Sequence, residues 1–190
     1  MVPATVISTE LPAPSEETVA IALDFNVVFS QQVRYLWYTL RRLGIRDGDL
    51  EDIAHEVMLR VHAQLPQHDP ARPIRTWLFA LALGAAANYR RLARHRVELQ
   101  AVPPDTRDPG CAIDEDMILR ERRNLVQRAL QQVPLQHRAV LILHDMDETP
   151  VPEIAAALGI GANTAYSRLR LGREAFRKAL QRLMARGGSK

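Results

Sequence analysis

The sequence has a single cysteine, Cys111, among its 190 residues. A disulfide within the chain is therefore impossible, and we expect a protein of a reducing compartment. No run approaches the roughly 18 consecutive apolar residues of a membrane span, so no membrane insertion is predicted. The N-terminus also lacks a basic stretch followed by an apolar one, which argues against a signal peptide. Together these absences predict a cytoplasmic protein.

Strand-like alternation, a phosphate-cradling glycine loop and an internal repeat are also missing. Apolar residues recur instead at helical spacing, which predicts an all-α protein. The 12 prolines cluster in an N-terminal tail, in residues 66–73, in residues 103–109 and in residues 150–152. Because proline interrupts helices, these clusters mark connections rather than cores.

No group of residues has the composition of a catalytic or metal site. Asp52 and Glu56 stand one helical turn apart, but no nucleophile or metal ligand accompanies them as an acid–base pair would require. His55 and His62 are seven residues apart, and a metal site would need further ligands. The chain is therefore predicted not to be an enzyme and to need no cofactor or metal.

The net charge of +3 conceals strong segregation. Counting Lys and Arg against Asp and Glu gives −4 for residues 1–65, +4 for 66–101, −4 for 102–116 and +7 for 117–190. Basic segments favour polyphosphate partners through counterion release. Only two of the 25 basic residues are lysine, and arginine suits phosphate and guanine edges. Codon bias toward Arg and Ala accounts for most of that excess.

Residues 136–185 carry the strongest local pattern. Ile154, Ala155 and Leu158 fall on one helical face, and Gly159 follows where a helix must end in the left-handed conformation. A basic helix comes next, and Asn163 or Thr164 is predicted to cap it. A short helix, a glycine turn and a basic second helix form a helix-turn-helix, which fits the major groove of DNA. The alternative is an ordinary helical hairpin with a solvated basic face.

In this second helix, Ala165, Leu169 and Phe176 are predicted to pack inward. Such helices read base edges with their N-terminal part and grip phosphates with the flanks. Asn163 could instead serve only as a cap, and Arg168 could pair only with a nearby acid. The candidate DNA-binding residues are Asn163, Thr164, Tyr166, Ser167, Arg168, Arg170 and Arg173.

The N-terminal part predicts one or two helices over residues 20–43, a polar turn at 47–49, and helices over 49–65 and 74–96. Asp49 or Asp47 is predicted to cap the helix over 49–65. The helix over 49–65 would bury Leu50, Ile53, Val57, Val61 and Leu65. The acidic residues on the rest of this helix surface form a solvated or partner-binding face. The helix from residue 74 would bury Ile74, Trp77, Leu78, Leu81 and Ala85, with Thr76 among its polar positions. Further helices are predicted over residues 117–133 and 136–146.

With these segments in place, the chain resembles the extracytoplasmic-function (ECF) group of bacterial sigma factors. Three stretches carry the resemblance: DLEDIAHEVMLRVH, RPIRTWLFALA and VPLQHRAVLILHDMDETPVPEIAAALGIGANTAYSRLRLGREAF. The resemblance implies two small helical domains joined by a flexible acidic linker. The expected divisions are a disordered tail at 1–19, a sigma-2-like domain at 20–97, the linker at 98–116 and a sigma-4-like domain at 117–187.

The resemblance also implies roles and partners: core RNA polymerase, double-stranded promoter DNA, the melted non-template strand and an anti-sigma factor. Core polymerase would dock on Asp49, Asp52, Glu56 and Arg60. The loop at residues 67–73 and the following helix would bind the −10 element, with the C-terminal domain on the −35 element. The candidate −10 residues are His68, Arg72, Arg75, Thr76, Trp77, Asn88, Tyr89, Arg90 and Arg91.

Two alternatives remain open at this point. A stand-alone helix-turn-helix regulator would bind DNA without polymerase, and an interaction module would have lost promoter reading. The departures from the family pattern bear on the second. Gly84 stands where an Asn is common, next to Leu83 where a basic residue is frequent, and Tyr166 and Leu171 also replace basic residues. Gly84 has no side chain with which to read a base.

Overall fold

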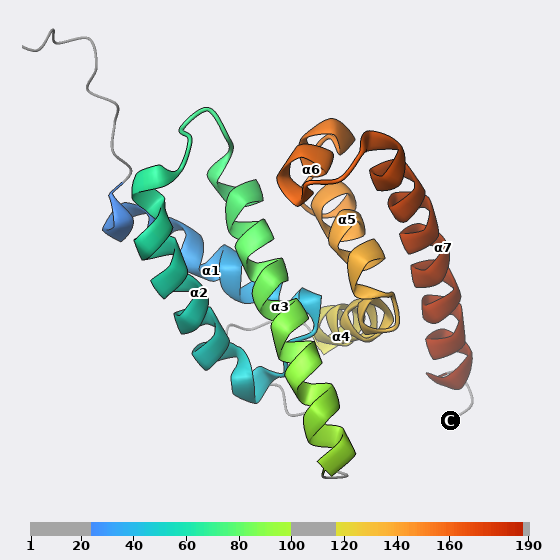
Figure 1. The fold of residues 1–190 in the computed structure, drawn as a ribbon. Helices are drawn as coiled ribbons and strands as arrows, with labels where there is room; N and C mark the ends of the chain where they lie inside the picture. The colour runs from blue at the N-terminus through green and yellow to red at the C-terminus, as the bar shows by residue number, and fades with distance from the viewer. Residues whose placement is uncertain (1–23, 100–116, 188–190) are drawn as a thin grey trace, which may run out of the picture.

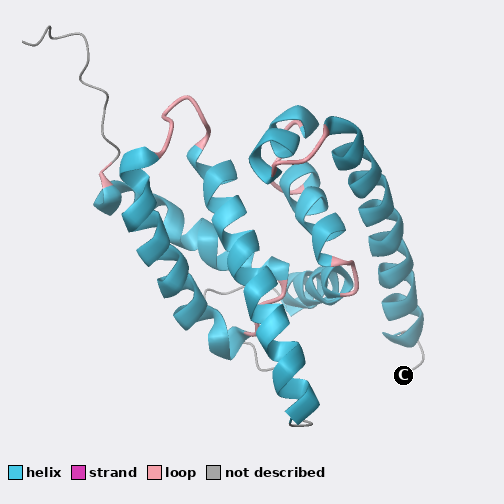
Figure 2. Ribbon diagram, viewed as in Figure 1, coloured by secondary structure: helices cyan, strands magenta, loops and turns pink. Residues whose placement is uncertain are grey.

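The computed structural model describes residues 24–99 and 117–187, and for residues 94–99, 117, 118 and 187 the backbone alone. All regular elements in these ranges are helical (Figure 2). They are α1 (Phe25–Leu43), η2 (Asp47–Asp49), α2 (Leu50–Gln64), η3 (Leu65–Gln67), α3 (Ile74–Leu99), α4 (Met117–Gln131), α5 (Leu135–Asp145), α6 (Val151–Leu158) and α7 (Ala162–Gly187). The all-α prediction is confirmed. The expected tail at 1–19 and most of the expected linker at 98–116 lie outside the described residues.

The helices form two bundles that pack against each other. Helices α1, α2 and α3 make the first bundle, and α4 to α7 make the second. In Figure 1, α5 lies between α3 and α7, so the second bundle abuts the first along α3 and α1. One continuous hydrophobic cluster joins Leu36 and Phe79 of the first bundle to Ile142 and Ile154 of the second. Burial of these apolar side chains is the main contribution to stability.

Local sequence explains where α1 begins and ends. The Asp24 carboxylate accepts a hydrogen bond from the Asn26 N–H at 2.8 Å, which caps the first turn. Gly44 ends the helix with φ 102°, and its N–H donates to the carbonyls of Leu40 and Arg41. The predicted end of this helix at Gly44 is confirmed.

Two predicted caps are wrong. Asp49 precedes α2, but its side chain makes no capping hydrogen bond; it accepts one from the Tyr89 hydroxyl instead. Helix α7 begins at Ala162, so Asn163 and Thr164 lie inside its first turn and not before it. The Gly161 carbonyl accepts the Ala165 N–H at the start of that helix.

The predicted inner face of α3 was incomplete. Leu78 and Ala85 are buried as expected, but Phe79 is fully buried too. Thr76, assigned from its polarity to the outer face, is only 6% exposed. Both side chains are covered because α3 packs against the first bundle on one side and against α5 and α6 on another. The spacing of apolar residues indicates one buried stripe and cannot show a second contact.

Candidate nucleic-acid and polymerase interfaces

The helix-turn-helix has the expected turn. Gly159 ends α6 with φ 63°, and its N–H donates to the carbonyls of Ala155 and Ala156. The Ile160 N–H donates to the Ala155 carbonyl at 3.0 Å. Ile154 and Ala155 are buried, so α6 is fixed to the core while α7 leaves the turn in a new direction.

The start of α7 presents its side chains outward. Ala165 and Leu169 are buried, and Tyr166 and Ser167 between them face solvent. Tyr166 is 55% exposed, although it is one of the large apolar side chains. Of the seven candidate −35 residues, six are exposed and Arg168 is half-buried; the exposed six are Asn163, Thr164, Tyr166, Ser167, Arg170 and Arg173. The structure therefore brings this set together on one helical surface.

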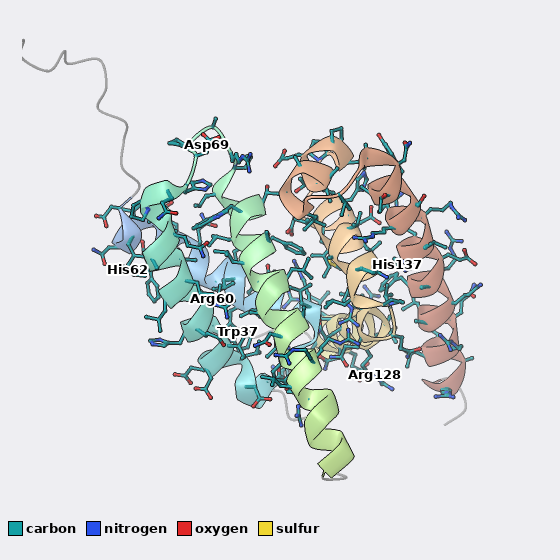
Figure 3. The ribbon with its side chains drawn as sticks, viewed as in Figure 1. Trp37, Arg60, His62, Asp69, Arg128 and His137 are labelled. Carbon is teal, nitrogen blue, oxygen red and sulfur yellow. The ribbon has the colours of Figure 1, made fainter. Side chains whose placement is uncertain are left out.

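Arg173 differs from the others because it is paired. Its Nε donates to Asp145 Oδ2 at 2.9 Å, and its Nη2 donates to the other carboxylate oxygen. This hydrogen bonding lowers the pKa of Asp145 below its ordinary value. A second charged residue of α7, Arg168, affects a histidine of α5. Burial and the Arg168 guanidinium lower the pKa of His137, which lies on α5 facing α7 (Figure 3).

The loop before α3 is held by its own side chains. The Ala71 N–H donates to the Asp69 carboxylate at 3.0 Å, and Figure 3 shows Asp69 at the loop tip. The His68 ring lies 4.6 Å from the Trp77 ring, with 37° between their planes. An imidazole nitrogen of His68 also lies 3.2 Å from the Arg72 carbonyl oxygen. Aromatic rings at a loop next to a basic helix can stack on unpaired bases.

Arg75 and Thr76 follow this loop but are engaged within the protein. Arg75 donates to the Gln32 side chain at 3.3 Å, and its guanidinium lies 5.4 Å from the centre of the Tyr35 ring. The Thr76 hydroxyl donates to Glu153 Oε1 at 2.7 Å. Glu153 belongs to α6, so a candidate −10 residue touches the helix-turn-helix bundle.

The remaining candidate −10 residues lie far along α3. Tyr89 is 13 residues beyond Thr76, which is about 20 Å at the helical rise. The Tyr89 hydroxyl donates to Asp49 at 2.5 Å and accepts from Arg46 Nε at 2.8 Å. Asn88 accepts a hydrogen bond from Arg91. The structure therefore divides the predicted set into a group at the start of α3, with the loop, and a distant group that comprises Asn88, Tyr89, Arg90 and Arg91.

The candidate docking face on α2 is similarly divided. Asp52 is exposed, and Arg60 donates to Glu56 along the helix. Asp49, by contrast, is tied to Tyr89 and Arg46. Leu59 is 60% exposed beside the Glu56–Arg60 pair and was not singled out from the sequence. Its position off the apolar stripe of the helix was the available signal.

Comparison with known proteins identifies the family to which this chain belongs. Residues 28–96 match the model of sigma-70 region 2, and residues 123–176 match that of sigma-70 region 4. The class of protein is thus a sigma-70-type factor. The chain is 31% identical over 160 residues to the ECF RNA polymerase sigma factor SigL of Mycobacterium tuberculosis, covering 83% of this chain and 89% of that one.

Two further likenesses agree. The chain is 32% identical over 160 residues to the RNA polymerase sigma factor CarQ of Myxococcus xanthus, across 84% of this chain and 90% of that one. The fold also matches the sigma factor RpoE of Bartonella quintana, solved in complex with the anti-sigma factor NepR. That match has a TM-score of 0.67 and 17% identity, over 83% of this chain and 97% of the other. The chain belongs to the ECF family of RNA polymerase sigma factors.

Membership decides between the functions left open by the sequence. This chain is an alternative sigma factor, which directs promoter-specific transcription initiation. The alternative of a stand-alone regulator is not favoured. None of the helices in the described ranges is long and apolar enough to cross a membrane.

Proposed function

We propose that the exposed N-terminal turns of α7 read the −35 element, and that the residue 67–73 loop with the start of α3 binds the −10 strand. The observation that carries the proposal is the exposure of six of the seven candidate −35 side chains on one surface of α7. Arg170 is suited to a bidentate bond with guanine, and Arg173 to phosphate. The divisions at 20–97 and 117–187 are the units that we assign to the two elements.

In this proposal the protein acts in the cytoplasm with core RNA polymerase and double-stranded promoter DNA, and with the non-template strand once it is melted. The polymerase performs the chemistry, so the chain itself is not an enzyme. An anti-sigma factor is a further proposed partner, since the RpoE relative was solved with one. Run-off transcription with purified core polymerase tests the proposal: the protein should be required for initiation from a selected promoter. Equal transcription without it would contradict the proposal.

The α2 surface is the proposed docking site for core polymerase. Asp52 is exposed, and Glu56 is half-buried and paired with Arg60, on a helix whose opposite side is already buried, so both carboxylates lie on the side left for a partner. Reversing both charges, with Asp52→Arg and Glu56→Arg, should reduce affinity for core polymerase at least about tenfold, or about 1.4 kcal/mol. The matched control reverses Glu51 and Glu121, which are also exposed. Unchanged affinity in the first variant would rule out this docking surface.

A further inference from the structure

Arg173 lies on the same side of α7 as two other candidate −35 residues. It follows Tyr166 by two helical turns and Arg170 by one, and the three side chains line an open hollow of about 690 Å³ along the helix. Arg170 makes no hydrogen bond to any residue that the structure describes, whereas Arg173 makes several. The two arginines of this surface therefore differ, because one is unbonded and the other is held in place.

The residue that holds Arg173 is Asp145, at the C-terminal end of α5. Arg173 Nε donates to Asp145 Oδ2 at 2.9 Å, and Nη2 donates to Oδ1. Two such parallel hydrogen bonds fix a guanidinium and a carboxylate in one geometry. Hydrogen bonding to Arg173 is also the largest cause of the lowered pKa of Asp145, so the carboxylate stays charged at neutral pH.

The backbones that carry the pair are themselves held close together. Gly172 precedes Arg173, and a Cβ there would lie 2.9 Å from the His137 carbonyl oxygen, so α5 and α7 approach closely at this point. A further side chain adjoins the pair: His144 Nδ1 lies 2.7 Å from Asp145 Oδ1 and 3.2 Å from Arg173 Nη2. The pair thus has a fixed backbone and a neighbour that limits how the carboxylate can turn.

The bonding leaves one end of the guanidinium open. An arginine side chain has five N–H donors. Asp145 takes the Nε donor and one from Nη2, and both donors of Nη1 are without a partner in the described part of the chain. The Arg173 side chain is 47% exposed, so a group outside the protein has access to it. On DNA, a phosphate oxygen is a suitable acceptor for such a donor.

A contribution to stability does not account for this pair. Ion pairs open to solvent contribute little to folding, and Asp145 is itself 32% exposed. The pair does restrict a long side chain to one conformation before any ligand arrives. Ordering such a side chain is one of the costs of binding, and a side chain that is already ordered avoids that cost.

We infer that Asp145 is a positioning residue for DNA binding, which holds Arg173 so that Nη1 meets a backbone phosphate beside the bases that Arg170 reads. The inference deepens the proposed function, since it rests on α7 lying at the −35 element. It gives a residue of α5 a part in DNA binding that the sequence pattern places on α7 alone.

The sign of the effect separates this role from simple electrostatics. A carboxylate close to DNA repels the phosphates, so removing one should by itself strengthen binding. Removing Asp145 should instead weaken binding, because Arg173 loses its fixed position. Glu174 provides the matched control, since it is the next residue on α7 and is bonded to Lys178 and not to Arg173.

The test uses reconstituted polymerase holoenzyme and a promoter DNA that the wild-type protein selects from a randomised pool, with affinity measured over a range of salt concentrations. Asp145→Asn keeps the size of the side chain and removes its charge. We expect it to bind about fivefold more weakly than Glu174→Gln, which removes the same charge. The slope of log affinity against log salt should become shallower by about 0.9, the loss of one phosphate contact, in Asp145→Asn alone.

Two further variants show whether Asp145 acts through Arg173. Arg173→Ala should lose affinity too, and adding Asp145→Asn to it should cause no further loss. Arg173→Lys keeps the charge without the paired donors and should bind as weakly as Asp145→Asn; it provides the same test should Asp145→Asn fold poorly.

Several results would overturn the inference: Asp145→Asn binding as tightly as Glu174→Gln, a further loss in the double variant, or Arg173→Lys binding as tightly as the wild-type protein. The wild-type holoenzyme is also tested on the same DNA with its −35 element scrambled. If it does not discriminate between the two DNAs, the proposed function fails together with the inference. If it discriminates and the loss in Asp145→Asn is absent, the inference alone fails.

Discussion

The two surfaces proposed to read promoter DNA differ in what their side chains contact. At the start of α7, Ser167 and Arg170 face solvent. At the start of α3, Thr76 is buried and bonded to Glu153, and Arg75 is held by Gln32 and Tyr35. The proposed −35 side chains are therefore mostly open to solvent, whereas in the proposed −10 set Thr76 is already bonded to the second bundle.

The largest expected effect comes from Arg138, which joins the bundles from inside. Burial lowers the pKa of Arg138 to about 10, so it remains charged at neutral pH. Arg138→Ala would leave the Leu43, Gln131 and Val133 carbonyls without this donor. The free energy of unfolding should fall by about 3 kcal/mol in urea denaturation. The exposed Arg122→Ala is the control; equal losses for both would show that the contact between the bundles contributes little.

Two helical glycines test the packing of α7 and of α3 separately. A Cβ at Gly172 of α7 would lie 2.9 Å from the His137 backbone carbonyl oxygen, so Gly172→Ala must push α7 away from α5. A Cβ at Gly84 of α3 meets nothing within 4 Å. We expect Gly172→Ala to destabilise by about 2 kcal/mol and Gly84→Ala to stabilise by about 1 kcal/mol. Thermal unfolding of the two variants measures whether each is more or less stable than the wild-type protein. A stabilising Gly172→Ala would contradict the close contact between α7 and α5.

A smaller, pH-dependent effect on stability is expected from His137 of α5, which lies near Arg168 of α7. Burial and Arg168 lower the pKa of His137 below its ordinary value of 6.5. Below pH 6.5 the unfolded chain therefore binds more protons than the folded protein, and stability rises with pH until it levels off above that value. His137→Gln should make the urea midpoint of unfolding less dependent on pH between about pH 5 and pH 7.5. The exposed His55→Gln serves as control, and an identical slope in both variants would exclude His137 as the source.

The sequence indicated the local features and missed those that depend on distant contacts. The ends of α1 at Gly44 and of α6 at Gly159 follow from the conformational freedom of glycine, which is a property of single residues. The burial of Thr76 depends on Glu153, 77 residues away, and no periodicity reports such a contact. The exposed face of α7 was predictable because Ala165 and Leu169 set its orientation. The division of the candidate −10 residues into two groups was not predictable, because it depends on the hydrogen bond from Tyr89 to Asp49, 40 residues away.

The most direct test of the two-surface account is a selection from promoters randomised at both elements, read by the reconstituted polymerase holoenzyme. We expect wild-type protein to enrich sequences at both elements. Arg170→Ala should flatten the preference at −35 alone, by about 1–3 kcal/mol of discrimination, while Arg75→Ala should weaken selection at −10 alone. If both variants leave the ranking at their own element unchanged, or each alters the other's element, the assignment of α7 and α3 to the two elements is wrong.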